Sequence, residues 1–253
     1  MMTLKVDLNA DMGESFGQWD MGNDAALLKV VTSANIACGF HAGDPDVMAQ
    51  TMRLALQNNV GIGAHPGFAD LQGFGRRRLA LSSNALSNMV TYQLGAAQAM
   101  ARAAGGELRH FKLHGALANW ASEDADVARC CYKAVLTCAP DLNIFVLAAT
   151  EMERVVREMG CLWSGEIFAD RAYKEDATLV DRSLPGAVIT DPKIAAQRIS
   201  DMVRAKAIIS SSGQHVPARI DTVCLHGDGA SALAIARSVR ETLKDAGISV
   251  QKV

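Results

Sequence analysis

The sequence has almost no net charge and no long apolar run, and each absence excludes a class of protein. The 253 residues carry a formal net charge of −2, so the chain lacks the electrostatic footprint of a protein that binds nucleic acid or an anionic membrane surface. The longest apolar stretch, 142–149, contains Asn143 and is far shorter than the roughly 20 residues that a membrane-spanning helix needs. We therefore expect no nucleic-acid partner and no membrane partner.

Paired cysteines and a secretion signal are also missing. The six cysteines show no C-x-x-C spacing, and Cys130 and Cys131 are adjacent within a predicted helix, which argues against a disulfide framework. The first residues contain no basic segment followed by an apolar run, so we expect no signal peptide. Together these features predict buried free thiols and a cytoplasmic location.

Alternating strand and helix patterns run through the whole chain. Hydrophobic residues make up 49% of the sequence, and no linker or low-complexity segment divides it, so we expect a single domain over 1–253. Strands are predicted over 4–9, 33–38, 61–64, 110–113, 142–147, 162–168 and 222–225, and helices over 25–31, 45–58, 83–104, 123–138, 151–159, 192–209 and 230–246. About seven such units predict an α/β protein with a parallel sheet.

The segment 33–45 shows the pattern most clearly. A short apolar run stops at Gly39, a histidine follows at position 41, and Asp44-Pro45 then opens a helix. Asp is a favoured N-cap, and Pro fits the first helical position because its missing N–H would have no partner there. The segment is therefore predicted to form a strand, a loop that presents His41, and a helix.

Polar side chains follow the ends of most predicted strands, from the beginning of the chain to its end. These residues are Asn9, Asp11, His41, His65, Lys112, His114, Glu166, His226 and Asp228. An open sheet gathers its ligand-binding groups at one crevice, whereas in a barrel every strand exit faces one site. We therefore expect a closed barrel with these side chains around a common mouth. Small residues beside the histidines suggest room for a ligand near the backbone.

The residue types at these exits suit hydrolytic chemistry. Asp11, His41 and His65 can hold a divalent metal or act as general acids and bases. Lys112 can stabilise an oxyanion or a phosphate, and Arg76 can bind a carboxylate or phosphate through its guanidinium. His110 lies within a predicted strand and is expected to be a core residue or to face a helix. The sequence contains no Walker-type phosphate-binding loop.

Six blocks of the sequence resemble the LamB/YcsF family, and they occur in the family's order along almost the whole chain. They are 7–14, 33–45, 63–67 with 73–77, 112–117, 166–173 and 226–228. The chain differs from the family pattern at Leu113 and Asp181, where the family usually has Pro, and at Ala118, where it usually has Tyr.

The resemblance implies a fold, an activity and partners. The fold would be a distorted seven-stranded β/α (TIM-like) barrel similar to the glycoside hydrolase/deacetylase superfamily. The activity would be ATP-dependent cleavage of the lactam of 5-oxo-L-proline to L-glutamate, performed together with two further subunits, B and C. The cofactor would be ATP, and the site could in addition hold a divalent metal.

On these grounds we expect two sets of site residues. The catalytic set is Asp11, His41, His65, Lys112, His114, Glu166 and His226, with Asp11, His41 and His65 as the ligands if a metal is present. The substrate-binding set is Asn9, Glu14, Asn35, Arg76, Asp170, Arg171 and Asp228. Two alternatives stay open: a metal-dependent deacetylase or amidase that needs no ATP, and a non-catalytic subunit that binds a sugar or a lactam.

Overall fold

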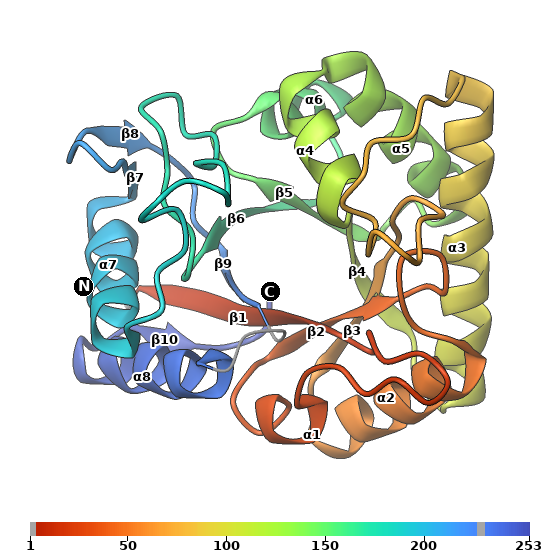
Figure 1. Ribbon diagram of the computed structural model, residues 1–253, viewed down its shortest axis with the longest axis horizontal. Helices are drawn as coiled ribbons and strands as arrows, with labels where there is room; N and C mark the ends of the chain where they lie inside the picture. Colours follow the sequence, from red (N-terminus) through yellow and green to blue (C-terminus); the bar gives the residue numbers. More distant parts are fainter. Residues whose placement is uncertain (1–3, 227–230) are drawn as a thin grey trace.

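Parallel strands close into a barrel, which confirms the predicted fold class. The computed structural model describes residues 4–226 and 231–253. Within these residues, seven parallel strands pair in chain order, and the last of them also pairs with the first (Figure 1). They are β1 (Lys5–Met12), β2 (Ser33–Ala37), β3 (Gly61–His65), β4 (Leu108–Lys112), β5 (Asn143–Leu147), β6 (Trp163–Phe168) and β9 (Thr222–Leu225). A short strand, β10 (Ser249–Val250), which was not predicted, pairs with the start of β1.

Helices surround the barrel on its outside (Figure 1). They are α1 (Asp24–Leu27), α2 (Pro45–Gln57), α3 (Ser83–Ala103), α4 (Gly115–Glu123), α5 (Ala125–Cys138), α6 (Glu151–Met159), α7 (Pro192–Ala205) and α8 (Ala232–Asp245). The Asp44 side chain accepts hydrogen bonds from the backbone N–H groups of Asp46 and Val47, so the predicted cap of α2 is confirmed. Along the described part of the chain, no helix combines the length and the apolar character that crossing a membrane requires.

Alternate residues of the strands point to opposite sides of the barrel wall. On β1, Leu8 and Ala10 belong to the apolar layer beneath the helices, whereas Asn9 and Asp11 form hydrogen bonds across the barrel interior. The strand register places Asp11 beside Asn35 of β2. The barrel interior is therefore polar, and Asn9, Asp11 and Asn35 of the predicted site lie within it.

The segment after β4 differs from the prediction of one helix over 123–138. Helix α4 begins at Gly115, directly after His114, and ends at Glu123. Asp124 then caps α5 by accepting hydrogen bonds from the N–H groups of Asp126 and Val127. The missed helix matters because it forms one wall of the site described below.

The predicted helices 25–31 and 192–209 are shorter than expected, since they end at Leu27 and Ala205. Lys206 takes a left-handed conformation, with φ of 50°, and ends α7. The next residues form β7 (Ala207–Ile209), which pairs antiparallel with β8 (His215–Pro217). The start of the final predicted helix, residue 230, lies outside the described residues, and α8 is observed from Ala232.

Candidate functional site

Three histidines from three different strand exits form a cluster at the carboxyl end of the barrel. The rings of His41 and His114 stack with centroids 3.6 Å apart, and the His65 ring stands edge-on to both, at 5.5 Å from His41 and 4.9 Å from His114. The structure therefore brings together three residues from distant parts of the sequence. All three side chains are buried.

The hydrogen bonds of His65 and His114 determine which ring nitrogens carry protons. His65 donates from Nδ1 to the Lys112 carbonyl at 2.9 Å, and His114 donates from Nε2 to the Phe74 carbonyl at 2.8 Å. The remaining nitrogens, His65 Nε2 and His114 Nδ1, face each other at 3.0 Å. In neutral rings both of these atoms present lone pairs. The contact therefore requires either one additional proton or a cation between the two rings.

Burial keeps the imidazoles of His41 and His114 neutral. It lowers the pKa of His41 well below its ordinary value, and the neighbouring His114 and His65 rings lower it further. Burial also lowers the pKa of His114 to about 3, with His65 as the second cause. Glu14 lies beside both rings, with Oε1 3.4 Å from His41 Nε2 and 3.7 Å from His114 Nδ1. These neutral rings have the form that a metal ligand or a general base requires.

Glycines in the loop after β3 allow the backbone to pack against the histidine rings. A Cβ atom on Gly67 would lie 2.8 Å from His41 Nδ1. A Cβ atom on Gly75, whose φ is +62°, would lie 2.7 Å from the Cβ of His41 and 2.9 Å from Cδ2 of His114. The space provided by these small residues is thus occupied by histidine rings, rather than by a ligand as the sequence suggested.

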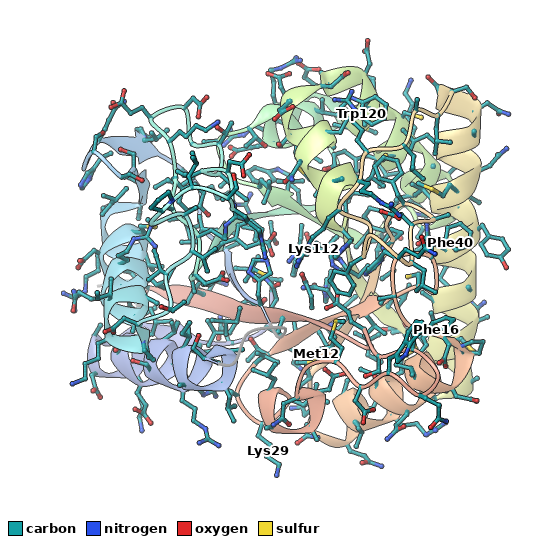
Figure 2. All side chains as sticks on the ribbon, in the orientation of Figure 1. Met12, Phe16, Lys29, Phe40, Lys112 and Trp120 are labelled. Carbon is teal, nitrogen blue, oxygen red and sulfur yellow. The ribbon has the colours of Figure 1, made fainter. Side chains whose placement is uncertain are left out.

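Lys112 lies in the middle of the barrel (Figure 2) and is surrounded by acidic and polar atoms. Its Nζ lies 3.0 Å from Asp11 Oδ1 and 2.9 Å from Glu166 Oε1. Nζ also lies 3.0 Å from Cys224 Sγ, a contact that was not predicted. Burial by itself would lower the pKa of Lys112, but Asp11, Cys224 and Glu166 raise it well above its ordinary value. The side chain is therefore a fixed positive charge.

Asp11 links this ammonium group to the histidine cluster. Its Oδ2 lies 3.4 Å from His65 Nε2, while Oδ1 contacts Lys112. Burial alone would raise the pKa of Asp11, but the neighbouring His65 and Lys112 side chains hold it well below its ordinary value. Asp11 is therefore ionised in the folded protein at neutral pH.

Asn9 and Asn35, predicted to bind substrate, lie beneath the site and are fully buried. The Asn35 amide donates to Asn9 Oδ1 at 2.7 Å and to Asp11 Oδ1 at 2.9 Å, and its oxygen accepts from His110 Nε2 at 2.8 Å. Both amides are thus hydrogen-bonded within the protein: Asn35 holds Asp11 in place, and Asn9 Oδ1 lies 3.4 Å from Lys112 Nζ. His110 was predicted to be a core residue or to face a helix, and the structure shows the first: its ring is buried and stacks on Phe145.

The far side of the site is built from the exits of β6 and β9. Both carboxylate oxygens of Asp170 lie within hydrogen-bond distance of His226 Nδ1, at 2.7 and 2.9 Å. The His226 ring stacks on Phe168, and its Nε2 lies 3.4 Å from a guanidinium nitrogen of Arg182. Arg182 was not predicted, because it belongs to a long loop without a motif. Asp228, which was predicted, lies outside the described residues.

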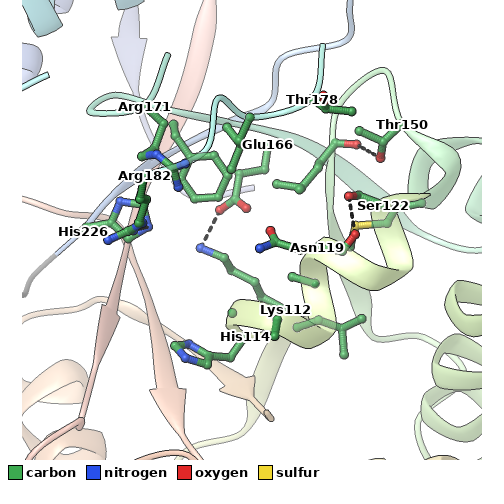
Figure 3. A pocket seen from close by; sticks show the side chains of 18 of the residues that line it. Lys112, His114, Asn119, Ser122, Thr150, Glu166, Arg171, Thr178, Arg182 and His226 are labelled. Carbon is green, nitrogen blue, oxygen red and sulfur yellow. Dashed lines mark hydrogen bonds and ion pairs between the residues drawn. The ribbon is translucent and has the colours of Figure 1, made fainter. Parts of the chain in front are cut away.

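These groups surround a cavity of about 480 Å³ (Figure 3). The predicted site residues that line it include Lys112, Glu166, Arg171, His226 and Arg76. The cavity also has walls that the sequence did not indicate, from α4, the start of α6 and the loop after β6. Their polar lining residues include Asn119, Ser122, Glu123, Thr150, Lys174, Thr178, Asp181 and Arg182.

The two arginines after Gly75 have different environments. The Arg76 guanidinium lies 5.0 Å from the centre of the Phe74 ring and lines the cavity. Arg77 instead pairs with the buried carboxylate of Asp70, which also accepts a hydrogen bond from the Gly73 N–H. Arg76 is therefore the one of the two that a ligand in the cavity can reach, whereas Arg77 anchors the loop.

The donor set of the histidine cluster suits a divalent metal. One ligand atom each from Glu14, His41, His65 and His114 lies within 4.8 Å of the other three, and all four residues are buried. This set contains two of the three predicted ligands, while Asp11 falls in a second group with Cys224 and His226. The carbonyl partners of His65 and His114 direct unprotonated nitrogens inward, as the hydrogen-bond partners of metal-ligating histidines do.

Comparison with known proteins gives a match over nearly the full length. The LamB/YcsF family matches residues 6–253. The A subunit of 5-oxoprolinase from Ruegeria pomeroyi is 65% identical over 246 residues, which cover 97% of each chain. The crystal structure of a lactam utilization protein from Thermus thermophilus superposes with a TM-score of 0.93 at 44% identity, covering 99% of this chain and 100% of that one.

A more distant structure shares the fold alone. The family 4 carbohydrate esterase of Streptomyces lividans has a TM-score of 0.51 at 12% identity, covering 98% of this chain and 92% of that one. This likeness agrees with the predicted resemblance of the barrel to deacetylase folds.

Proposed function

Because the chain belongs to the LamB/YcsF family, we propose that it is the A component of a 5-oxoprolinase, which cleaves the lactam of 5-oxo-L-proline to L-glutamate with coupled ATP hydrolysis. The 65% identity to the corresponding 5-oxoprolinase component of Ruegeria pomeroyi, over 97% of both chains, carries this proposal. The site supports it, since a buried cation, ionised carboxylates and neutral histidines surround one cavity.

Lactam cleavage makes three demands on the site. The amide is resonance-stabilised, so its oxygen needs a positive charge as negative charge develops there. A base has to take a proton from the attacking water, and an acid has to give one to the departing nitrogen. Lys112, held at 2.9–3.0 Å from two carboxylates, is the fixed charge that stabilises the amide oxygen or a phosphate attached to it.

The proton transfers fall to the groups around Lys112. Asp11, His41 and His65 activate the water: Asp11 lies 3.4 Å from His65 and is ionised, and burial keeps His41 neutral. The remaining proton is handled by His114, Glu166 or His226, all three of which line the cavity around Lys112 (Figure 3).

The substrate carboxylate needs a cationic partner. Arg76 and Arg171 line the cavity and can each form two parallel hydrogen bonds with a carboxylate. Glu14 and Asp170 lie beside the histidines and complete the polar wall. Asn9 and Asn35 act from below, by holding Asp11 and Lys112 in position.

We further propose that a divalent metal binds the cluster of Glu14, His41, His65 and His114. When bound, such an ion polarises a carbonyl and lowers the pKa of a coordinated water. A bound cation would also satisfy the two lone pairs that face each other on His65 Nε2 and His114 Nδ1. A metal titration that leaves the melting temperature unchanged would contradict this assignment.

ATP coupling is proposed for the assembly with subunits B and C. The relatives are named as A subunits of 5-oxoprolinase, which supports the existence of other subunits. The sequence holds no Walker-type loop that would cradle the phosphates of ATP. We also propose that 1–253 acts as one domain in the cytoplasm.

The experiment measures 5-oxoproline-dependent ADP release and glutamate formation by this chain, with and without candidate B and C subunits. Replacing His65 or Lys112 by Ala is expected to abolish glutamate formation without unfolding the chain. His215→Ala, at an exposed position of β8, is the matched control and is expected to behave as wild type. Full turnover by both site variants would refute the proposed site.

The same assay separates the alternatives. The histidine–glutamate cluster favours a metal-dependent deacetylase or amidase as the second candidate. That enzyme would lose activity with a chelator and would need no ATP. A non-catalytic binding subunit would bind the lactam without turnover and would tolerate replacement of Lys112.

A further inference from the structure

One end of the cavity carries two arginines that face the same space. Arg171 and Arg182 lie next to His226, across the cavity from Asn119 and Ser122 of α4 (Figure 3). Arg171 lies shortly after the end of β6 at Phe168, whereas Arg182 lies further along the loop between β6 and α7. The loop therefore brings a second guanidinium to a site where the strand exit already provides one.

Arg171 is buried with part of its guanidinium unsatisfied. It is 6% exposed, and it donates one hydrogen bond, from an Nη atom to the Val180 carbonyl at 2.6 Å. Its Nε is buried and has no hydrogen-bond partner within the described residues. An unpaired buried donor costs free energy, so such groups in proteins usually face a ligand, a water or an ion.

The nearby carboxylates are already engaged. Asp170 contacts His226 Nδ1 through both oxygens. Asp181 accepts hydrogen bonds from the N–H and the hydroxyl of Ser183. Burial lowers the pKa of Arg171, and the positive charge of Arg182 lowers it further. The two guanidinium groups therefore lie close enough to repel each other, and among the described residues neither Asp170 nor Asp181 forms an ion pair with either of them.

We propose that Arg171 and Arg182 form a binding site for a phosphate dianion, either free or carried on a small molecule. A single carboxylate is satisfied by one guanidinium fork, whereas a tetrahedral dianion offers oxygens and charge for two. Arg76, on the histidine side of the cavity above Phe74, then serves the substrate carboxylate.

The size of the cavity agrees with a second ligand. Its volume of about 480 Å³ lies in the range of about 300–1,000 Å³ that drug-sized ligands occupy, so one small lactam leaves room. The inference extends the proposed function, in which ATP hydrolysis yields phosphate, but it does not require that the lactam be the substrate.

The test is calorimetric titration of the full chain with inorganic phosphate at neutral pH and physiological salt. Wild type is expected to bind phosphate saturably, and Arg182→Gln is expected to weaken binding about tenfold or more, because a charged bidentate partner is lost. Arg182 is exposed, so this variant is expected to fold, as circular dichroism will verify. Arg78→Gln is the control, because Arg78 stacks on Trp120 outside the cavity.

Absence of saturable binding by wild type, or equal weakening by Arg182→Gln and Arg78→Gln, would overturn the proposal. A parallel titration with ATP identifies the source: tighter binding than phosphate, again lost in Arg182→Gln, assigns the site to a nucleotide, and weaker binding assigns it to a free or monoester phosphate. Lactam turnover without phosphate binding would refute this inference alone. Phosphate binding without lactam turnover would refute the proposed function alone.

Discussion

Replacing Lys112 by Met tests the centre of the site most directly. Methionine matches the length of the lysine stem but removes the charge that contacts Asp11 at 3.0 Å and Glu166 at 2.9 Å. Both carboxylates are buried, and removing one partner of a buried ion pair costs about 3–5 kcal/mol because the other charge is left uncompensated. Against a total stability of about 5–15 kcal/mol, this loss is large enough to measure in urea.

The double variant Lys112→Met/Glu166→Gln separates stability from catalysis. Gln removes one of the two uncompensated charges, so we expect it to recover a substantial part of the lost free energy of unfolding. Turnover by the reconstituted assembly is expected to stay about 10²–10³-fold low in both variants, since the charge near the amide oxygen is missing. Wild-type stability in Lys112→Met, or no recovery in the double variant, would refute the reasoning.

Three further predictions concern pH, backbone and metal. His110 and His114 have folded-state pKa values of about 3, against an ordinary value of 6.5. Between these two pH values the unfolded chain binds more protons than the folded one. The free energy of unfolding is therefore expected to fall as the pH falls from about 6.5 toward about 3. Urea titrations at about pH 7.5 and about pH 5.5 should differ by about 1 kcal/mol for each of the two histidines. Gly75→Ala should destabilise by about 1–3 kcal/mol, because φ is +62° and a histidine fills the space, whereas Gly95→Ala, with open space in α3, should not. Zinc is expected to raise the melting temperature, and a chelator to reverse that rise, as scanning calorimetry would show.

The order of the strands and most helix starts were predictable because their signals are local. Asp44-Pro45 opens α2 as predicted, and Asp191-Pro192 opens α7 at the predicted residue, since an N-cap carboxylate and a proline at the first turn act within one turn of chain. The end of α7 was not predictable in this way. Lys206 ends the helix in a left-handed conformation, and the residues after it pair with β8, a partner further along the chain.

Helix α4 was missed for a related reason. It begins directly after His114 and has no side chain that caps its first turn, so the usual start signal is absent from the sequence. Its position is set instead by the loop before it, because the Ala116 N–H donates to the Gly75 carbonyl. A long-range contact therefore determined an element that carries one wall of the cavity.

The sequence by itself determined which side chains stand at the strand exits, because alternation along a strand and the parallel direction of the strands send those residues to one end of the barrel. Only the tertiary structure decided how they meet: that Asn35 lies beneath the site and holds Asp11, that His65 and His114 oppose their lone pairs, and that Arg182 joins Arg171. These arrangements depend on contacts between residues far apart in the chain, and no local pattern encodes their distances.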